Sequence, residues 1–369
     1  GFRFEGYGFE LTLKPQLSWS QNKEFEYITP AYSGSAYSGK ADRYGYYGVA
    51  SVDAPQRFGN SSFATFDWGD SEVRYSWNSF TVGAGTQAIW LGPAKLNPIL
   101  HSNNAPSYPK IDLGLRKTEL GNFGAIEGRV WYGRLTESEW FDNNSENNIN
   151  LIAGISAAWA LSGIFEGLTL GVNRTMLSKW DNLSKRSLFG IFLPKLDTSA
   201  GSDKNDQRFS FSVDYLMPKS NLELYVEWGY NDYYNSLYQF IRYPFHTRGI
   251  TAGINKAFQL KNKNSIEFLF EYTNLESTRD YELVDWTTTF YAHHIITQGH
   301  TNKGQWLGAG IGTGGNSQYF GIKYRTSKTG WTVFLQRRNP DLDYTWYKDD
   351  NSDKRTESSI RAMLNTGLE

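Results

Sequence analysis

The 369-residue sequence contains no cysteine, so it can form neither a disulfide bond nor a metal site with thiolate ligands. It also lacks a long hydrophobic run. The best candidate for a membrane-spanning helix, residues 151–165, carries no charge but includes Gly154 and Gly163. It is shorter than the ~17–25 residues that such a helix needs. We therefore interpret this stretch as part of a β-hairpin.

Excess charge of either sign is missing as well, with 37 basic and 38 acidic residues. A chain without a basic surplus has no electrostatic footprint for nucleic acid. The chain begins at Gly1 rather than methionine, and no signal peptide is visible in it. We expect a processed or trimmed start, with a signal peptide and a possible helical plug missing. No change of composition divides residues 1–369, so a single domain is predicted.

The sequence does contain a strict alternation of apolar and polar residues. Apolar side chains occupy every second position in most of 7–19, and the pattern returns in 209–215, 222–228 and 266–272. Alternate residues of a β-strand point to opposite faces, so each stretch has one apolar and one polar face. Aromatic residues make up 16% of the chain, as expected for aromatic girdles at two membrane interfaces. This pattern is typical of a transmembrane β-barrel.

Short polar turns alternate with long loops between the expected strands. The short turns are 68–71, 218–221, 261–264 and 326–330. The long loops, rich in Asn, Asp, Ser, Tyr and Gly, are 29–43, 91–110, 136–150, 176–206, 231–246, 279–317 and 340–357. Outer-membrane barrels have short periplasmic turns and long extracellular loops. We therefore predict an all-β fold, a transmembrane antiparallel β-barrel of about 18 strands in the bacterial outer membrane, with its long loops folded over or into the lumen.

The stretch 90–110 differs from an ordinary barrel loop, because four prolines and paired asparagines make it stiff and irregular. One interpretation is a structured loop that folds into the lumen as a plug. The other is a sugar-binding surface, where an aromatic ring supplies a flat apolar platform and asparagine supplies a donor and an acceptor. The residues that would serve the second function are Trp90, Asn97, His101, Asn103 and Asn104.

Two blocks of this chain resemble a known family. Residues 90–94 (Trp-Leu-Gly-Pro-Ala) and 102–106 (Ser-Asn-Asn-Ala-Pro) are similar to the signature of the Wzi family of capsule-assembly proteins. Residues 291–308 resemble that family's later block, where histidine and an aromatic residue precede spaced glycines. The resemblance implies an eighteen-stranded outer-membrane lectin, without catalysis, that binds capsular or related surface polysaccharide and helps to attach or assemble it at the cell surface. With the loop composition, it gives these candidate carbohydrate-binding residues: Trp90, Lys95, Asn97, His101, Asn103, Asn104, His300 and Trp306.

The resemblance is incomplete at two places. The family usually has a signal peptide and N-terminal helices that plug the periplasmic end, which are not seen before Gly1. The first long loop, at 32–43, also lacks the Asn-Asp-Gly block that the family tends to carry there. We therefore expect that the plug, and with it the ligand, can differ from those of the family.

Catalytic and metal chemistry find little support in the sequence. His293 and His294 are adjacent and would point to opposite faces of a strand, so no metal site is expected. The glycine-rich run 310–315 fits a dinucleotide-binding pattern but is followed by an expected strand instead of a helix, so no cofactor is expected either. No carboxylate pair or nucleophile–base motif indicates a hydrolase. The alternatives left open are a porin-like or substrate-specific channel and an accessory subunit of a larger outer-membrane complex. The expected partners are surface polysaccharide and outer-membrane lipid, including lipopolysaccharide, but not nucleic acid.

Overall fold

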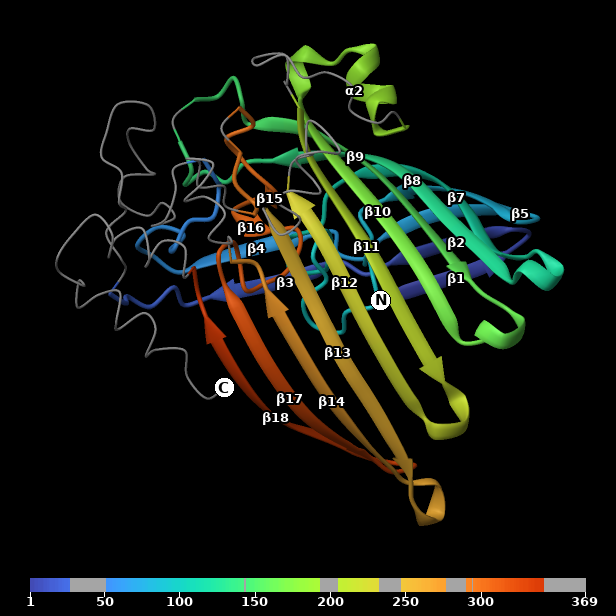
Figure 1. Cartoon of the computed structure of the whole chain (residues 1–369). Coiled ribbons are helices and arrows are strands. Elements are labelled where there is room, and N and C mark those ends of the chain that lie inside the picture. The colour runs from blue at the N-terminus through green and yellow to red at the C-terminus, as the bar shows by residue number, and fades with distance from the viewer. Residues whose placement is uncertain are drawn as a thin grey trace, which may run out of the picture.

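Antiparallel strands form nearly all the regular structure of the computed structural model (Figure 1). The structure describes residues 1–26, 51–142, 144–192, 205–231, 247–276, 290–293 and 295–341. Its strands are β1 (Phe2–Gly6), β2 (Phe9–Leu13), β3 (Gln16–Ser20), β4 (Phe63–Asp67), β5 (Glu72–Trp77), β6 (Phe80–Gly85), β7 (Lys110–Glu119), β8 (Ala125–Thr136), β9 (Ile149–Ala160), β10 (Leu168–Lys179), β11 (Asn205–Met217), β12 (Leu222–Asn231), β13 (Arg248–Gln259), β14 (Ser265–Asn274), β15 (Thr301–Asn302), β16 (Gln305–Trp306), β17 (Asn316–Arg325) and β18 (Gly330–Asn339).

Fourteen of these eighteen strands lie in one antiparallel sheet, in the order β1-β2-β5-β6-β7-β8-β9-β10-β11-β12-β13-β14-β17-β18. Strands β3 and β4 pair with each other and extend the β2–β5 ladder past Pro15, whose missing N–H interrupts it. Strands β15 and β16 form a small hairpin within a loop. The expected number of about 18 strands is confirmed for the part of the chain that the structure describes.

The two faces of the sheet differ as the alternation predicts. On β7, Ile111 and Leu113 are about 60% exposed, whereas the alternating Lys110 and Asp112 are buried. A barrel in lipid turns its apolar face to the membrane and its polar face to the lumen. The polar face here carries a network in which Arg74 and Arg129 each contact the Asp112 carboxylate at 2.8 Å. We assign this polar face to the lumen.

Short turns close the hairpins at one end of the barrel. Four are single 3₁₀ turns, at 121–123, 163–165, 218–220 and 261–263. The turn at 163–165 joins β9 to β10, so the interpretation of 151–165 as part of a hairpin is confirmed. Among the helices that the structure describes, none is long and apolar enough to cross a bilayer.

Candidate functional site

The 86–109 loop, which joins β6 to β7, lies inside the barrel and is held there by carboxylates of the opposite wall. The Glu271 carboxylate on β14 accepts hydrogen bonds from the backbone N–H groups of Lys95 (2.7 Å), Leu96 (3.2 Å) and Asn97 (2.8 Å). A charged acceptor strengthens each of these bonds. The loop is therefore anchored across the lumen from the strands that it connects.

Glu227 on β12 provides a second anchor for the 86–109 loop. Its carboxylate accepts a hydrogen bond from the backbone N–H of Ile99 at 3.0 Å. Gly92 lies against the same carboxylate, where a Cβ would come within 2.8 Å of it. Gly92 also has φ +84°, a backbone conformation that favours glycine. Both features explain why the Trp-Leu-Gly-Pro-Ala block needs its glycine.

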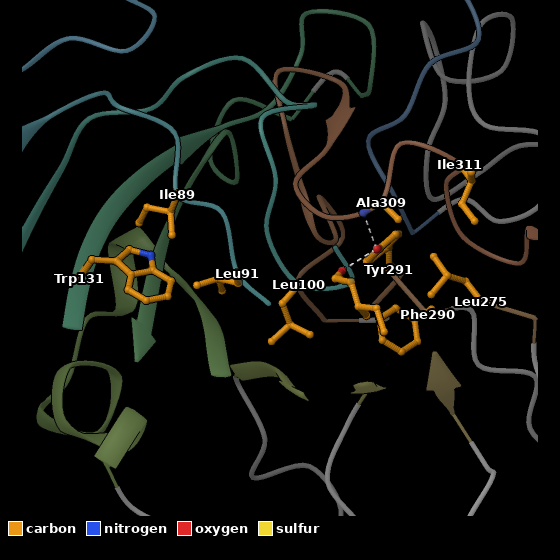
Figure 2. Packing of buried hydrophobic residues seen from close by; sticks show 10 residues of the cluster. Ile89, Leu91, Leu100, Trp131, Leu275, Phe290, Tyr291, Ala309 and Ile311 are labelled. Carbon is orange, nitrogen blue, oxygen red and sulfur yellow. Dashed lines mark hydrogen bonds between the residues drawn. The ribbon is translucent and has the colours of Figure 1, made fainter. Parts of the chain in front are cut away.

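A second segment, residues 290–293 and 295–315, packs on the 86–109 loop. The Tyr291 hydroxyl donates to Ile99 O at 2.6 Å and accepts from Ala309 N at 2.8 Å, as the dashed lines in Figure 2 show. His300 Nε2 lies 2.6 Å from Leu100 O, so it donates to that carbonyl. The two loops are thus connected by hydrogen bonds from buried side chains.

An apolar cluster forms between these two loops and the inner wall (Figure 2). Its buried members are Ile89, Leu91, Ile99, Leu100, Trp131, Leu275, Phe290, Tyr291, Ala309 and Ile311. Beside it, Arg208 of β11 is fully buried, paired with Asp206 at 2.6 Å, and donates to Phe290 O at 2.9 Å. These contacts support the interpretation of the 90–110 stretch as a structured plug. We refer to the 86–109 loop together with the second segment as the plug.

Two of the candidate residues, Trp90 and Lys95, lie toward the lumen on the short-turn side of the plug. Trp90 is 42% exposed and borders a cavity of about 560 Å³, and its indole N–H donates to Ala94 O. The Lys95 ammonium contacts Glu223 at 2.6 Å and lies over the Tyr225 ring. Both side chains thus face the lumen, away from the end of the barrel that carries the long loops (the long-loop end).

Three other candidates are buried within the plug, namely Asn97, His101 and His300. His101 Nε2 lies 2.6 Å from the Tyr108 hydroxyl. Burial, reinforced by the charge of Lys110, lowers the pKa of His101 to about 4. Burial also lowers the pKa of His300 well below its ordinary value. Both rings are therefore neutral near pH 7. Their hydrogen bonds are with the two loops, and the His101 ring also packs edge-on against Trp131 of the barrel wall.

The remaining candidates, Asn103, Asn104 and Trp306, do not line the cavity. Trp306 lies in the β15–β16 hairpin, which is held at the long-loop end of β8 by the bond from Thr136 N to Asn302 Oδ1. Both asparagines are exposed and Trp306 is half-buried. The Asn104 amide donates to Trp306 O at 2.9 Å, and the Trp306 ring packs 5.6 Å from the Tyr291 ring. The structure thus brings Asn104 and Trp306 together, next to the exposed Asn103. The eight candidates do not converge on one point.

Several residues that hold this site were not among the sequence candidates. They are the lumen-facing Glu227 and Glu271, the stacking Tyr291, and Ser102, whose hydroxyl donates to Gly308 O at 2.6 Å. The alternation places both glutamates on the polar face of a strand. It gives no sign of the partner, because the loop amides that bind Glu271 lie up to 176 residues away in sequence.

A polar groove of about 270 Å³ lies beside the candidate site, lined by Asn144, Glu146, Asn147, Lys179 and Asp181. The 137–148 loop forms one wall of the groove and contacts the second segment, because Asn147 Nδ2 donates to Thr297 Oγ1 at 3.4 Å. Within the described residues, no three His, Asp or Glu side chains are placed to hold a metal ion.

The base of the 137–148 loop contains a buried acid that should make the loop pH-sensitive. In the described part of the chain, neither carboxylate oxygen of Glu137 has a hydrogen-bond partner. Burial, with the charges of Asp142 and Asp53, raises the pKa of Glu137 from 4.5 to about 9. A raised pKa means that Glu137 favours the folded loop below about pH 4.5 and loses this contribution as pH rises toward 9.

We therefore expect the loop to be more protected from hydrogen exchange at pH 5 than at pH 9, after correction for intrinsic exchange rates. Glu137→Gln should remove most of that difference, because an amide does not ionise. Asp53, whose pKa burial raises to about 6, adds a smaller change at lower pH. An unchanged pH dependence in Glu137→Gln would contradict the assignment to this residue.

The comparisons with known proteins agree with this architecture. The profile of the family described as "Capsule assembly protein Wzi" matches residues 4–330. Among solved structures, the chain is similar to Wzi from Escherichia coli, described as an outer membrane protein involved in group 1 capsule assembly and a carbohydrate-binding β-barrel. The TM-score is 0.63 at 13% sequence identity, and the similarity covers 93% of this chain and 64% of that chain. No curated protein sequence matches.

The chain thus spans less than two thirds of the solved Wzi chain. The fold class, the family resemblance and the outer-membrane location predicted from the sequence are confirmed by the barrel architecture and the family match. The family match extends over most of the chain, well beyond the two blocks that first indicated it. This outer-membrane β-barrel belongs to the Wzi family of capsule assembly proteins.

Proposed function

We propose that this barrel binds capsular or related surface polysaccharide at its long-loop end and helps to attach or assemble it there. The observation that carries the proposal is the family match over residues 4–330. The plug supports it, because a lumen crossed by two hydrogen-bonded loops suits a binding surface better than a transport path. Binding without turnover is part of the proposal.

The chemistry of the long-loop end suits a glycan. Asn103 and Asn104 offer amide donors and acceptors to hydroxyl groups, and Trp306 offers a half-exposed ring face. The groove lined by Asn144 and Asn147 adds further amides. Asn147 Nδ2 donates to Thr297 Oγ1 at 3.4 Å, so the groove is in direct contact with the second segment.

Asn103→Ala is the cleanest test, because the Asn103 side chain is exposed and makes no hydrogen bond within the described residues. We expect its melting temperature to stay unchanged while affinity for purified capsular polysaccharide falls about fivefold or more, equivalent to losing one or two hydrogen bonds of about 1 kcal/mol each. The matched control is Asn122→Ala, in a short turn at the other end of the barrel. Equal polysaccharide retention by both variants would remove Asn103 from the site.

Three further measurements separate this proposal from its alternatives. A porin-like channel would show large, stable ion conductance in planar bilayers, whereas the plugged barrel should conduct little. An accessory subunit would co-purify with other outer-membrane proteins from native membranes in mild detergent. Glycan recovered intact after incubation with the protein would support binding without catalysis.

A further inference from the structure

The segment between β10 and β11 folds back against the barrel wall near the ends of β9 and β10. It comprises the 3₁₀ turn Trp180–Asn182, the helix α2 (Lys185–Phe189) and the 3₁₀ turn Gly190–Phe192. Ile191 is buried against Ala153 of β9 and Met176 of β10. Figure 1 shows α2 beside the long-loop end of these two strands.

The wall that this segment covers is the outer wall of the barrel. On β10, Thr169, Gly171 and Asn173 line the lumen cavity. Successive residues of a strand point to opposite faces, so Val172 and Met176 point outward. Val172 is accordingly 42% exposed, as expected for a lipid-facing position. The segment therefore turns at the end of β10 and folds back along the outside of the barrel.

Polar groups of the outer wall hold the segment in place. The Tyr132 hydroxyl of β8 donates to Leu188 O at 2.5 Å, and Arg174 Nη1 of β10 donates to Ile191 O at 3.0 Å. Arg174 also contacts the Gln207 side chain on β11. Arg174 follows the exposed Val172 by two positions, so the lipid-facing apolar belt ends there. The segment thus lies at the level where the membrane surface is expected.

The segment turns apolar side chains outward, away from the barrel. Phe189 is 60% exposed and Phe192 is 51% exposed, and Trp180, Leu183 and Leu188 are each about 40% exposed. Its sequence, residues 180–192, contains two basic residues and one acidic residue, giving a formal charge of +1. Exposed apolar residues interspersed with basic ones are typical of segments that lie in a membrane interface.

We propose that residues 180–192 form an interfacial segment, which inserts its apolar side chains into the outer leaflet and binds the phosphate groups of anionic lipids through the exposed Lys185. Two observations identify the membrane as the occupant. The exposed apolar side chains lie on the outside of the barrel at the point where its lipid-facing belt ends, and the positive charge of the segment complements anionic headgroups. This contact would fix the height and tilt of the barrel at its β8–β11 side.

The absence of cysteine allows a direct test on the full chain. Phe189→Cys, labelled with a fluorophore in a reconstituted bilayer, should be quenched by lipids with a nitroxide near the headgroup and protected from aqueous iodide. Leu183→Cys should behave in the same way. This second position keeps the test valid if the substitution at Phe189 disturbs folding. Asn144→Cys, exposed on the neighbouring loop, is the matched control and should be quenched by iodide. Iodide quenching at positions 183 and 189 equal to the control would overturn the proposal.

The lipid preference is tested with the same label. Protection of residue 189 from iodide should be about twofold greater in bilayers containing phosphatidylglycerol than in pure phosphatidylcholine. Lys185→Gln, which removes an exposed charge of the segment, should reduce that difference. Equal protection in both lipids, or an unchanged difference in Lys185→Gln, would overturn the phosphate-binding part of the proposal.

Discussion

Glu271→Ala is expected to release the 86–109 loop from the barrel wall and to raise ion conductance through the barrel several-fold. The Glu271 carboxylate accepts hydrogen bonds from three consecutive backbone N–H groups, of Lys95, Leu96 and Asn97, and from the Tyr225 hydroxyl at 2.7 Å. Without it, these donors lose their acceptor. Each buried donor left unpaired costs about 1–3 kcal/mol. The anchored conformation of the loop should therefore lose most of its free-energy advantage over a released one.

Planar-bilayer recordings and limited proteolysis of the loop measure this release. Glu271→Gln retains one acceptor oxygen and should give an intermediate conductance. Glu127→Ala is the control, because Glu127 also lines the cavity but makes no hydrogen bond to the loop in the described structure. A Glu271→Ala barrel that is folded, protease-resistant and as poorly conducting as Glu127→Ala would show that this carboxylate does not hold the plug.

The strands could be predicted from the sequence because their signal is local. Each stretch such as 222–228 carries its own alternation, and the short turns between stretches join neighbouring strands. The interruption at Pro15 was not predicted, since the apolar pattern continues through Leu17 and Trp19 on its far side. Periodicity records which face a residue takes, but not whether the ladder is continuous.

The loops were harder to predict because they have no period. Prolines and asparagines marked 90–110 as structured, but they could not distinguish a plug from a sugar-binding surface. The structure places parts of this stretch in both environments, with His101 buried and Asn103 exposed only two residues later. The contacts that decide this, such as His300 to Leu100, join segments about 200 residues apart. Single-sequence patterns do not contain such pairings.

Gly308→Ala should separate the two loops of the plug, although it adds only one methyl group. A Cβ at Gly308 would overlap both Ile99 O and the Tyr291 hydroxyl, which are themselves hydrogen-bonded. Gly308 is buried, and its carbonyl accepts the Ser102 hydroxyl, so the backbone has little room to move. Overpacking of a tight interior typically costs about 1–3 kcal/mol. The loss of the Tyr291 hydrogen bonds should place this variant near the upper end of that range.

A fall in the free energy of unfolding by about 3 kcal/mol, measured by urea titration in lipid vesicles, is the expected result. The loops should also become sensitive to protease, while the strands keep their circular dichroism. Gly330→Ala is the matched control, because a Cβ there would meet Tyr324 O at an ordinary 3.4 Å. Equal stability of the two variants would mean that the two loops can move apart without a loss of folding free energy. The hydrogen bonds between the loops would then contribute little to stability.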